Sequence, residues 1–497
     1  PSALTAAFSS LTSDPHLGVP SPSPQKTIVV DFSSPNVAKP MHIGHIRSTI
    51  LGDALARIAS FIGHRVIRDN HIGDWGTQFG MLLVGWKTEL QPDQLAIDPL
   101  GEMERLYKLI SARCQEHPPT LAAARAELVQ LQAGNPENLA LWEEMLRLSQ
   151  NQFAIIYQRL QITFDTTLGE SFYNPVLSST IDSLRSLGIA RPTEGALGVF
   201  SDGSLPEKED PFLIQRDGQW IPLPALVQKA DGASNYTTTD LATLDHRLQS
   251  YSPDSILYVT DGRQQHHFNQ LFAIFRRWQT STQTELAHVW FGTILGPDGR
   301  PFKTRSGQTV KLTDLLDEAE ERAFTIVTEK NPALPESERR AIAQIIGIGA
   351  VKYADLLPNR QSDYTFSWDK MLALTGNTAP YLQYSCVRIQ SIFRKAELQE
   401  PSTPLPISLN HPAELALALK LLQFGEVLPQ ILDDYRPNLL CNYLYELASL
   451  FHSFFEACPV LKADPLPRST RLALCTVADR ILRTGLNLLG ISVPERM

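Results

Sequence analysis

The sequence lacks the features that would place the chain in a membrane or an oxidising compartment. It has 497 residues, 43% of them hydrophobic, but no apolar run approaches the roughly 18–20 residues that a membrane span needs. Its five cysteines are scattered and none forms a C-x-x-C pair, which favours a reducing cytoplasm and predicts no zinc site. The net charge of −9 argues mildly against nucleic-acid binding, although an acidic protein can carry a local basic face.

The chain is long enough for about two to four domains, at roughly 100–200 residues each. Residues 1–25 begin with Pro1 and are rich in Ser, Pro and Thr. We interpret this segment as the remnant of an N-terminal domain followed by a linker.

A strand, helix and second strand follow this segment. The β-branched run Thr27–Phe32 predicts a buried strand, and Arg65–Arg68 predicts another. Between them, from Gly44 to Gly63, apolar residues recur at steps of three and four, which indicates a helix. Such a unit implies a parallel sheet that binds ligands at the carboxyl ends of its strands.

The rest of the chain continues this alternation and then becomes helical. The expected elements are helices over 100–165, a small β-rich insertion over 190–225, strands Ser255–Thr260 and Val289–Thr293 with a helix from about His267 between them, and a helix over Lys311–Ala323. We therefore predict an α/β fold, with a Rossmann-like parallel-sheet domain over 26–375, followed by an all-α bundle over 376–497. The first domain is expected to contain an insertion at about 86–225 and a connecting region at about 308–375.

The tetrapeptide His42-Ile43-Gly44-His45 lies where the first strand passes into the first helix. Two imidazoles there can donate hydrogen bonds to phosphate oxygens, and the helix amino end adds free N–H groups and partial positive charge. Gly44 lets a flat adenine ring approach the backbone closely. Taken alone, the motif also fits two surface histidines at the start of a helix.

The sequence around this motif resembles the signature of class I aminoacyl-tRNA synthetases and, within them, the arginyl-tRNA synthetases. The matching stretches, in order, are VDFSSPNVAKPMHIGH (30–45), VIRDNHIGDWGTQFG (66–80), YVTDGRQ (258–264) with His267, FKTRSG (302–307) and VPERM (493–497). They cover nearly the whole chain from about residue 26. The resemblance implies ATP, L-arginine and tRNA(Arg) as partners, Mg²⁺ accompanying the nucleotide, and a need for tRNA even in the first step.

The family's second phosphate-binding loop, usually KMSKS, corresponds here to Lys303–Gly307 and lacks its second lysine. The resemblance implies that Lys39 compensates, because a nearby ammonium stabilises the departing pyrophosphate. Lys39 could instead be a solvated loop lysine. The expected catalytic residues are His42, His45 and Lys39, and the expected ATP-binding residues are His42, Gly44, His45, Lys303, Arg305 and Ser306.

Selection of a guanidinium requires carboxylates in a fixed geometry. By resemblance, Tyr236, Asp240 and Glu170 bind the guanidinium end, and Ser34, Asn36 and Gln264 hold the α-amino and carboxylate groups, with Asp31 nearby. Glu170 could instead cap a turn, and Asp31 at the end of a strand could be structural.

The C-terminal region resembles the family's anticodon-binding bundle, through NTAPYLQY (377–384) and LCNYLYE (440–446). From residue 376 onward it carries 11 basic and 11 acidic residues, so charge alone does not mark it. Single-stranded bases can stack on tyrosine and arginine faces, which makes Tyr384, Arg388 and Tyr443 the candidates for tRNA contacts, with core packing as the alternative for each tyrosine.

The resemblance therefore implies a monomeric cytoplasmic enzyme that forms arginyl-adenylate and transfers arginine to the 3′ end of tRNA. Two alternatives remain open from the sequence. One is a smaller nucleotidyltransferase that uses no tRNA, and the other is a synthetase-derived tRNA-binding protein without catalysis.

Overall fold

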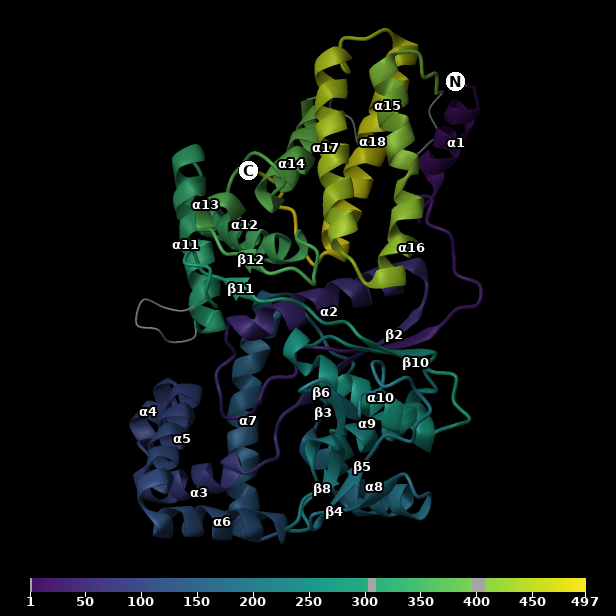
Figure 1. The fold of residues 1–497 in the computed structure, drawn as a ribbon. Coiled ribbons are helices and arrows are strands. Elements are labelled where there is room, and N and C mark those ends of the chain that lie inside the picture. The colour runs from purple at the N-terminus through teal and green to yellow at the C-terminus, as the bar shows by residue number, and fades with distance from the viewer. Residues whose placement is uncertain (1, 303–309, 396–406) are drawn as a thin grey trace.

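A computed structural model describes residues 2–302, 310–395 and 407–497 (Figure 1). An α/β part lies below a bundle of long helices in this view, and the helix α2 (Ile43–Ile62) runs between them. The predicted fold class, a parallel-sheet domain followed by an all-helical region, is confirmed.

The α/β part is built on a five-stranded sheet in the order β10-β9-β1-β2-β3, with every pair parallel. The strands are β1 (Thr27–Asp31), β2 (Arg65–Ile72), β3 (Thr166–Gly169), β9 (Ser255–Tyr258) and β10 (Glu285–His288). From β1 the chain proceeds to β2 and β3 on one side and returns to β9 and β10 on the other. The strand order therefore reverses between β1 and β9, and ligands of open α/β sheets bind at such a switch point.

Side chains of successive strand residues point to opposite faces of the sheet. Val29 and Ile256 face α9 (Tyr236–Tyr251) and α10 (Gln265–Trp278), in one buried cluster. Val30 and Leu257 face α2 and belong to the large core that continues into the helical bundle. Both faces of the sheet are thus covered, which leaves the ends of the strands as the places where a ligand can reach it.

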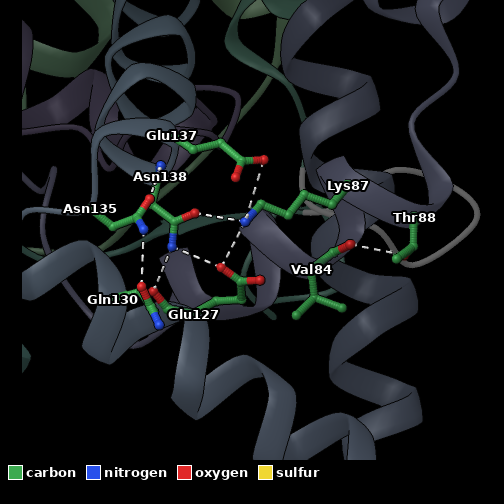
Figure 2. A network of polar contacts seen from close by, with 8 residues as sticks. All are labelled: Val84, Lys87, Thr88, Glu127, Gln130, Asn135, Glu137 and Asn138. Carbon is green, nitrogen blue, oxygen red and sulfur yellow. Dashed lines mark hydrogen bonds and ion pairs between the residues drawn. The ribbon is translucent and has the colours of Figure 1, made fainter.

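A helical insertion separates β2 from β3. It comprises α3 (Gln78–Glu89), α4 (Pro92–Ile97), α5 (Pro99–Glu116), α6 (Pro118–Gln132) and α7 (Pro136–Arg159). Figure 2 shows how Lys87 ties α3 to α6 and α7. Its ammonium lies 2.9 Å from Glu127 Oε2 on α6 and 2.7 Å from Asn138 Oδ1 on α7.

A smaller β-rich insertion lies between β3 and α9. It comprises η1 (Glu170–Tyr173), α8 (Asn174–Ser186), β4 (Ala190–Thr193), β5 (Ala196–Val199), β6 (Leu213–Arg216), β7 (Gln219–Pro222) and β8 (Ala225–Gln228). The short helix η2 (Gly262–Gln264) follows β9 and leads directly into α10.

The connecting region and the bundle complete the molecule. The connecting elements are β11 (Ile294–Leu295), α11 (Leu312–Lys330), α12 (Glu336–Leu356), β12 (Tyr364–Thr365) and α13 (Trp368–Met371). The bundle consists of α14 (Ala379–Lys395), α15 (Pro412–Leu422), α16 (Phe424–Asp434), α17 (Asn438–Ala457) and α18 (Pro465–Leu488).

Two local predictions differ from the structure. Residues 289–293 do not form a strand. The strand is Glu285–His288, and it ends where its neighbour β9 ends, at Tyr258. The segment interpreted as a remnant and linker contains helix α1 (Ser2–Ser13), whose Phe8 and Leu11 are buried and which packs against α15 and α18.

By length and mean hydropathy, one helical stretch of the described residues resembles a membrane span, Pro412–Asp434. In the structure it forms α15 and α16. Leu417, Leu421 and Leu428 from this stretch are fully buried in the bundle core, which accounts for its apolar character.

Candidate active site

The loop that leads from β1 into α2 has an unusual backbone. Ser33, Ser34 and Ala38 have positive φ values of 75°, 46° and 63°. Hydrogen bonds from neighbouring helices hold this conformation: Ser48 Oγ accepts from the Ser33 N–H at 2.9 Å, and Ser149 Oγ accepts from the Ala38 N–H at 3.0 Å. Strained backbone that is fixed in this way is concentrated at functional sites.

The two histidines of the H-I-G-H motif cap the amino end of α2. The Nδ1 atom of His42 accepts a hydrogen bond from the Gly44 N–H at 3.0 Å, and the Nδ1 atom of His45 accepts one from the His42 N–H at 3.1 Å. Because both Nδ1 atoms are acceptors, each neutral ring carries its proton on Nε2 and has that N–H to donate.

Both imidazoles are held in the neutral form. Burial lowers the pKa of His42, and burial together with the neighbouring His42 lowers the pKa of His45 to about 3. Each ring therefore presents an uncharged N–H donor, and the positive charge at this site comes from other groups. A side chain at Gly44 would collide with the His42 ring, since a Cβ there would lie 2.8 Å from His42 Cε1.

Two exposed cations provide positive charge near His42. Lys39 lies in the loop before the motif, with its ammonium 5.0 Å from the centre of the Tyr107 ring on α5. Arg263 lies on η2 and pairs with Asp261 at 2.8 Å. After burial and the opposing effect of Glu104, the charges of Arg263 and Lys39 both lower the pKa of His42. Arg263 was not predicted from the sequence, although it directly precedes Gln264 in the segment that follows β9.

A second group of side chains, on the other side of the strand ends, is acidic. Glu170 begins η1 and Asp240 lies in the first turns of α9. Burial, then the charges of Asp240 and Asp74, raise the pKa of Glu170 to about 7. Among the described residues, no lysine or arginine pairs with Glu170 or Asp240. The cluster therefore carries negative charge that a bound cation would neutralise.

Neighbouring groups fix these carboxylates. Asp74 accepts from the Ser171 N–H at 2.8 Å and from the Ser171 hydroxyl at 2.7 Å, which ties the start of η1 to the segment after β2. The Nε2 atom of His267 lies 2.6 Å from Asp240 Oδ2. The exposed ring of Tyr236 stacks edge-on against His267, with ring centres 4.9 Å apart.

The polar residues of the loop after β1 contact residues of β1, of β2 and of the segment that follows β2. The Ser34 hydroxyl donates to Asp31 Oδ1 at 3.0 Å, and its N–H donates to Asn70 Oδ1 at 3.1 Å. Asn36 is exposed and its carboxamide lies over Gly73, where a Cβ would come within 2.3 Å of Asn36 Oδ1. Asp31 is buried and also pairs with Arg247.

The first turn of α2 is anchored from behind. Arg47 is buried two residues after His45, and its Nε lies 3.1 Å from Asp355 Oδ1 on α12. Its Nη1 atom donates to the Gly292 carbonyl at 2.8 Å, in the segment that follows β10. The position of the histidine pair is thereby linked to the connecting region.

The structure thus brings most predicted site residues to the carboxyl ends of the central strands. His42, His45 and Lys39 lie with β1, Glu170 with β3, Gln264 with β9, and Tyr236 and Asp240 at the amino end of α9. Lys303, Arg305 and Ser306 lie outside the described residues. The predicted tRNA-binding residues lie on the bundle, far along the chain from this group.

Those bundle residues differ in exposure. Tyr384 is 44% exposed and lines a cavity of about 180 Å³ with Arg388, His452 and Phe455. Tyr443 is 3% exposed, and its hydroxyl donates to the Lys420 carbonyl at 2.9 Å. Its ring belongs to the core. Tyr443 therefore has no accessible surface for the base stacking that the sequence predicted there.

Two protein-family descriptions match the chain. "tRNA synthetases class I (R), catalytic domain" matches residues 8–368, and "DALR anticodon binding domain" matches residues 382–497. A curated arginine–tRNA ligase of Alcanivorax borkumensis is 47% identical over 501 residues, which cover 99% of this chain and 84% of that protein. Another, of Synechococcus sp., is 46% identical and covers 100% of this chain and 84% of its own length.

Solved structures give the same result. The arginyl-tRNA synthetase of Plasmodium falciparum aligns with a TM-score of 0.83 and 29% identity, over 100% of this chain and 83% of that one. The Thermus thermophilus arginyl-tRNA synthetase aligns with a TM-score of 0.81 and 25% identity, over 99% of this chain and 86% of that one.

The parallel sheet, the histidine pair at its switch point and these matches define a class I aminoacyl-tRNA synthetase. Within that class, the chain belongs to the arginyl-tRNA synthetase family.

Proposed function

We propose that this chain is an arginine–tRNA ligase that activates L-arginine with ATP and transfers it to the 3′ end of tRNA(Arg). The observation that carries the choice of amino acid is the acidic cluster of Glu170 and Asp240, which no cation of the described residues neutralises. A guanidinium is planar, permanently charged and able to donate to two carboxylates at once, so it matches this cluster better than any other amino-acid side chain.

The nucleotide is proposed to bind at the amino end of α2. The Nε2–H groups of His42 and His45 donate to its phosphate oxygens, and Gly44 leaves room for the base. Lys39 is proposed to stabilise the charge that develops on the leaving pyrophosphate, which the two neutral imidazoles cannot neutralise. Lys303, Arg305 and Ser306 are proposed from the sequence as further ATP contacts. Arg263 is added to this group because its charge reaches His42.

Mg²⁺ enters the proposal only as the counter-ion of ATP. The described residues contain no group of three His, Cys, Asp or Glu side chains placed to hold a metal ion. We therefore assign it no protein ligand and no step of the reaction.

Arginine is proposed to lie across the strand ends. Glu170, Asp240 and Tyr236 receive the guanidinium, and Ser34, Asn36 and Gln264 hold the α-amino and carboxylate groups. Asp31 is proposed to act beneath Ser34, whose hydroxyl it orients. In this placement the substrate carboxylate lies toward the histidine pair, where it can attack the α-phosphate in line.

The reaction has two steps. Attack of the arginine carboxylate on the α-phosphate forms arginyl-adenylate and releases pyrophosphate. A terminal ribose hydroxyl of tRNA then attacks the activated carbonyl and releases AMP. We place anticodon contacts on the bundle, at Tyr384 and Arg388, and propose that the enzyme works as a monomer in the cytoplasm, with its catalytic domain over 26–375 and its anticodon-binding domain over 376–497.

ATP–pyrophosphate exchange, run with each amino acid in the presence and absence of tRNA(Arg), tests this proposal. Exchange with arginine that depends on tRNA is the expected result. Exchange without tRNA would favour a smaller nucleotidyltransferase, and no exchange with any amino acid would favour a tRNA-binding protein without catalysis.

A further inference from the structure

Three buried polar residues lie side by side on the central strands, two of them at strand ends and Asp69 three residues before the end of β2. Asp31 on β1 is the register partner of Asp69 on β2 and of Tyr258 on β9. All three are at most 4% exposed and lie on the face of the sheet that α9 covers. Two carboxylates therefore lie side by side in an apolar environment, where uncompensated negative charge is costly.

The guanidinium of Arg247 contacts all three of these residues. Arg247 on α9 is fully buried, with Nη2 2.7 Å from Asp31 Oδ2 and 2.8 Å from Asp69 Oδ2. Its Nε atom donates to Asp69 Oδ2 at 2.9 Å, and the Tyr258 ring centre lies 5.3 Å from the guanidinium carbon. Among the described residues, Arg247 is the basic group paired with either carboxylate.

Arg247 also lies directly beneath the proposed arginine pocket. It follows Asp240 by seven residues on the same helix, which places it on the same face about two turns, or roughly 10 Å, deeper. Asp31 connects these buried residues to the loop after β1, because its other oxygen accepts a hydrogen bond from the Ser34 hydroxyl at 3.0 Å. One helix thus carries a carboxylate for the substrate and an internal guanidinium for the floor of the pocket.

The cluster is poorly arranged for stability alone. Arg247 Nη1 and Asp69 Oδ1 are buried without a hydrogen-bond partner among the described residues. A buried ion group that leaves polar atoms unpaired stabilises a fold no better than well-packed apolar side chains would.

We propose that Arg247 is a positioning residue for arginine selection, which pairs with both Asp31 and Asp69 and so leaves Glu170 and Asp240, which pair with no lysine or arginine of the described residues, to attract the substrate guanidinium. This inference rests on the proposed function. Arginine carries two cationic groups, and an uncompensated pair of carboxylates under the pocket would compete for both. Arg247 reduces that competition, because its guanidinium occupies one oxygen of each carboxylate, and through Asp31 it fixes the Ser34 hydroxyl for the α-amino group.

Steady-state aminoacylation by Arg247→Met and Arg247→Lys tests the proposal, with active-site titration to count competent enzyme. For Arg247→Met we expect the KM for arginine to rise at least tenfold while the KM for ATP stays within twofold. Arg247→Lys keeps one cation with fewer donors, so its KM for arginine should rise about three- to tenfold and stay below that of the methionine variant. Arg68→Met, which breaks the solvent-accessible contact of Arg68 with Asp165, is the matched control and should change neither KM.

A KM for arginine within twofold of the wild-type value in Arg247→Met, with only the competent fraction reduced, would overturn the proposal. Equal KM values for arginine in Arg247→Lys and Arg247→Met would also overturn the proposal, because the charge of residue 247 would then have no effect. If the methionine variant does not fold, Arg247→Lys decides, since a wild-type KM for arginine in that variant overturns the proposal. Arginine-dependent exchange by the wild type, together with its loss in Glu170→Gln, shows that the proposed function stands when only this inference fails.

Discussion

His267 and Asp240 form a close pair, with 2.6 Å between Nε2 and Oδ2. The imidazole joins α10 to α9 and holds the carboxylate in one orientation at the mouth of the pocket. The pair therefore fixes the orientation of the carboxylate that the proposed function assigns to the substrate guanidinium.

Replacement of His42 by Asn should slow arginine activation about 10- to 100-fold, because a hydrogen bond to a charged group contributes about 1.5–3 kcal/mol. The measurement is tRNA-dependent ATP–pyrophosphate exchange at saturating arginine. His64→Asn serves as the control, because His64 lies at the start of β2, at the opposite end of the strands. Equal rates in wild type and His42→Asn would show that the imidazole does not act on the phosphates.

The pKa of His45 adds a pH dependence to stability. It falls from 6.5 to about 3 on folding, so between these values the unfolded chain binds more protons than the folded one. The contribution of this group to stability is complete above pH 6.5 and declines as the pH falls toward 3. The imidazole itself stays neutral across the range in which activity is measured.

Glu170 should make both stability and arginine binding depend on pH, and its effect on stability has the opposite sign to that of His45. Its pKa rises from 4.5 to about 7 on folding, so the stability it contributes is complete below pH 4.5 and is lost as the pH rises through 7. A guanidinium prefers the ionised carboxylate. Arginine should therefore bind more tightly as the pH rises through 7, and below it binding should release a proton. Calorimetric titrations in buffers of different ionisation enthalpy measure that proton.

The same charge predicts opposite effects of Glu170→Gln on stability and binding. At pH 8 the variant should be more stable than the wild type by about 1–3 kcal/mol, since a pKa difference of one unit corresponds to 1.36 kcal/mol. Its affinity for arginine should nevertheless fall. Glu143→Gln, at an exposed position on α7, is the control and should change neither. Unchanged arginine affinity in Glu170→Gln would remove this carboxylate from the pocket.

Lys39→Ala should lower the rate of activation about 100-fold, the typical cost of removing one group that stabilises developing charge. Lys39→Arg, which keeps the charge, should recover a large part of the rate. Lys26 is also exposed but lies at the other end of β1, so Lys26→Ala should behave as the wild type. Nearly intact exchange in Lys39→Ala would show that Lys39 does not act with the histidine pair.

Tyr384→Ala should raise the KM for tRNA about 5- to 100-fold and leave the KM for arginine unchanged, because stacking on an aromatic ring contributes about 1–3 kcal/mol per base. Tyr443→Phe is a matched control. It removes a buried hydroxyl, so it should cost about 0.5–1.5 kcal/mol of stability and leave the KM for tRNA unaltered. The reverse outcome would place the tRNA contact at Tyr443 and not at the exposed ring.

The features that were predicted best are those that depend on residues close together in the sequence. The β1–α2 unit follows from a β-branched run, a helical period and Gly63, which ends α2 with φ of 116°. The strand predicted at Val289–Thr293 was wrong because its continuous apolar run has no period, and pairing with β9 instead selects Glu285–His288. Only the partner strand determines which part of such a run joins the sheet.

Long-range charge pairing could not be predicted. Arg247 lies 216 residues from Asp31 and 178 from Asp69, and no local pattern marks the three as partners. The hydrogen bond from the Tyr443 hydroxyl to the Lys420 carbonyl likewise joins two different helices. The residues of the H-I-G-H motif were accessible from the sequence because they are contiguous. The neutral state of their imidazoles was not, since it results from burial in the folded protein.

The most direct test of the account compares arginine with citrulline, its uncharged analogue, as substrates for tRNA charging by the wild type and by Asp240→Asn. Loss of a hydrogen-bonded group that a site is built to bind costs about 10⁴-fold, so the wild type should prefer arginine by roughly that factor in kcat/KM. In Asp240→Asn the preference should fall at least about 30-fold, because one charged partner of the guanidinium is gone. A wild-type preference in that variant would contradict the claim that the Glu170 and Asp240 carboxylates select arginine.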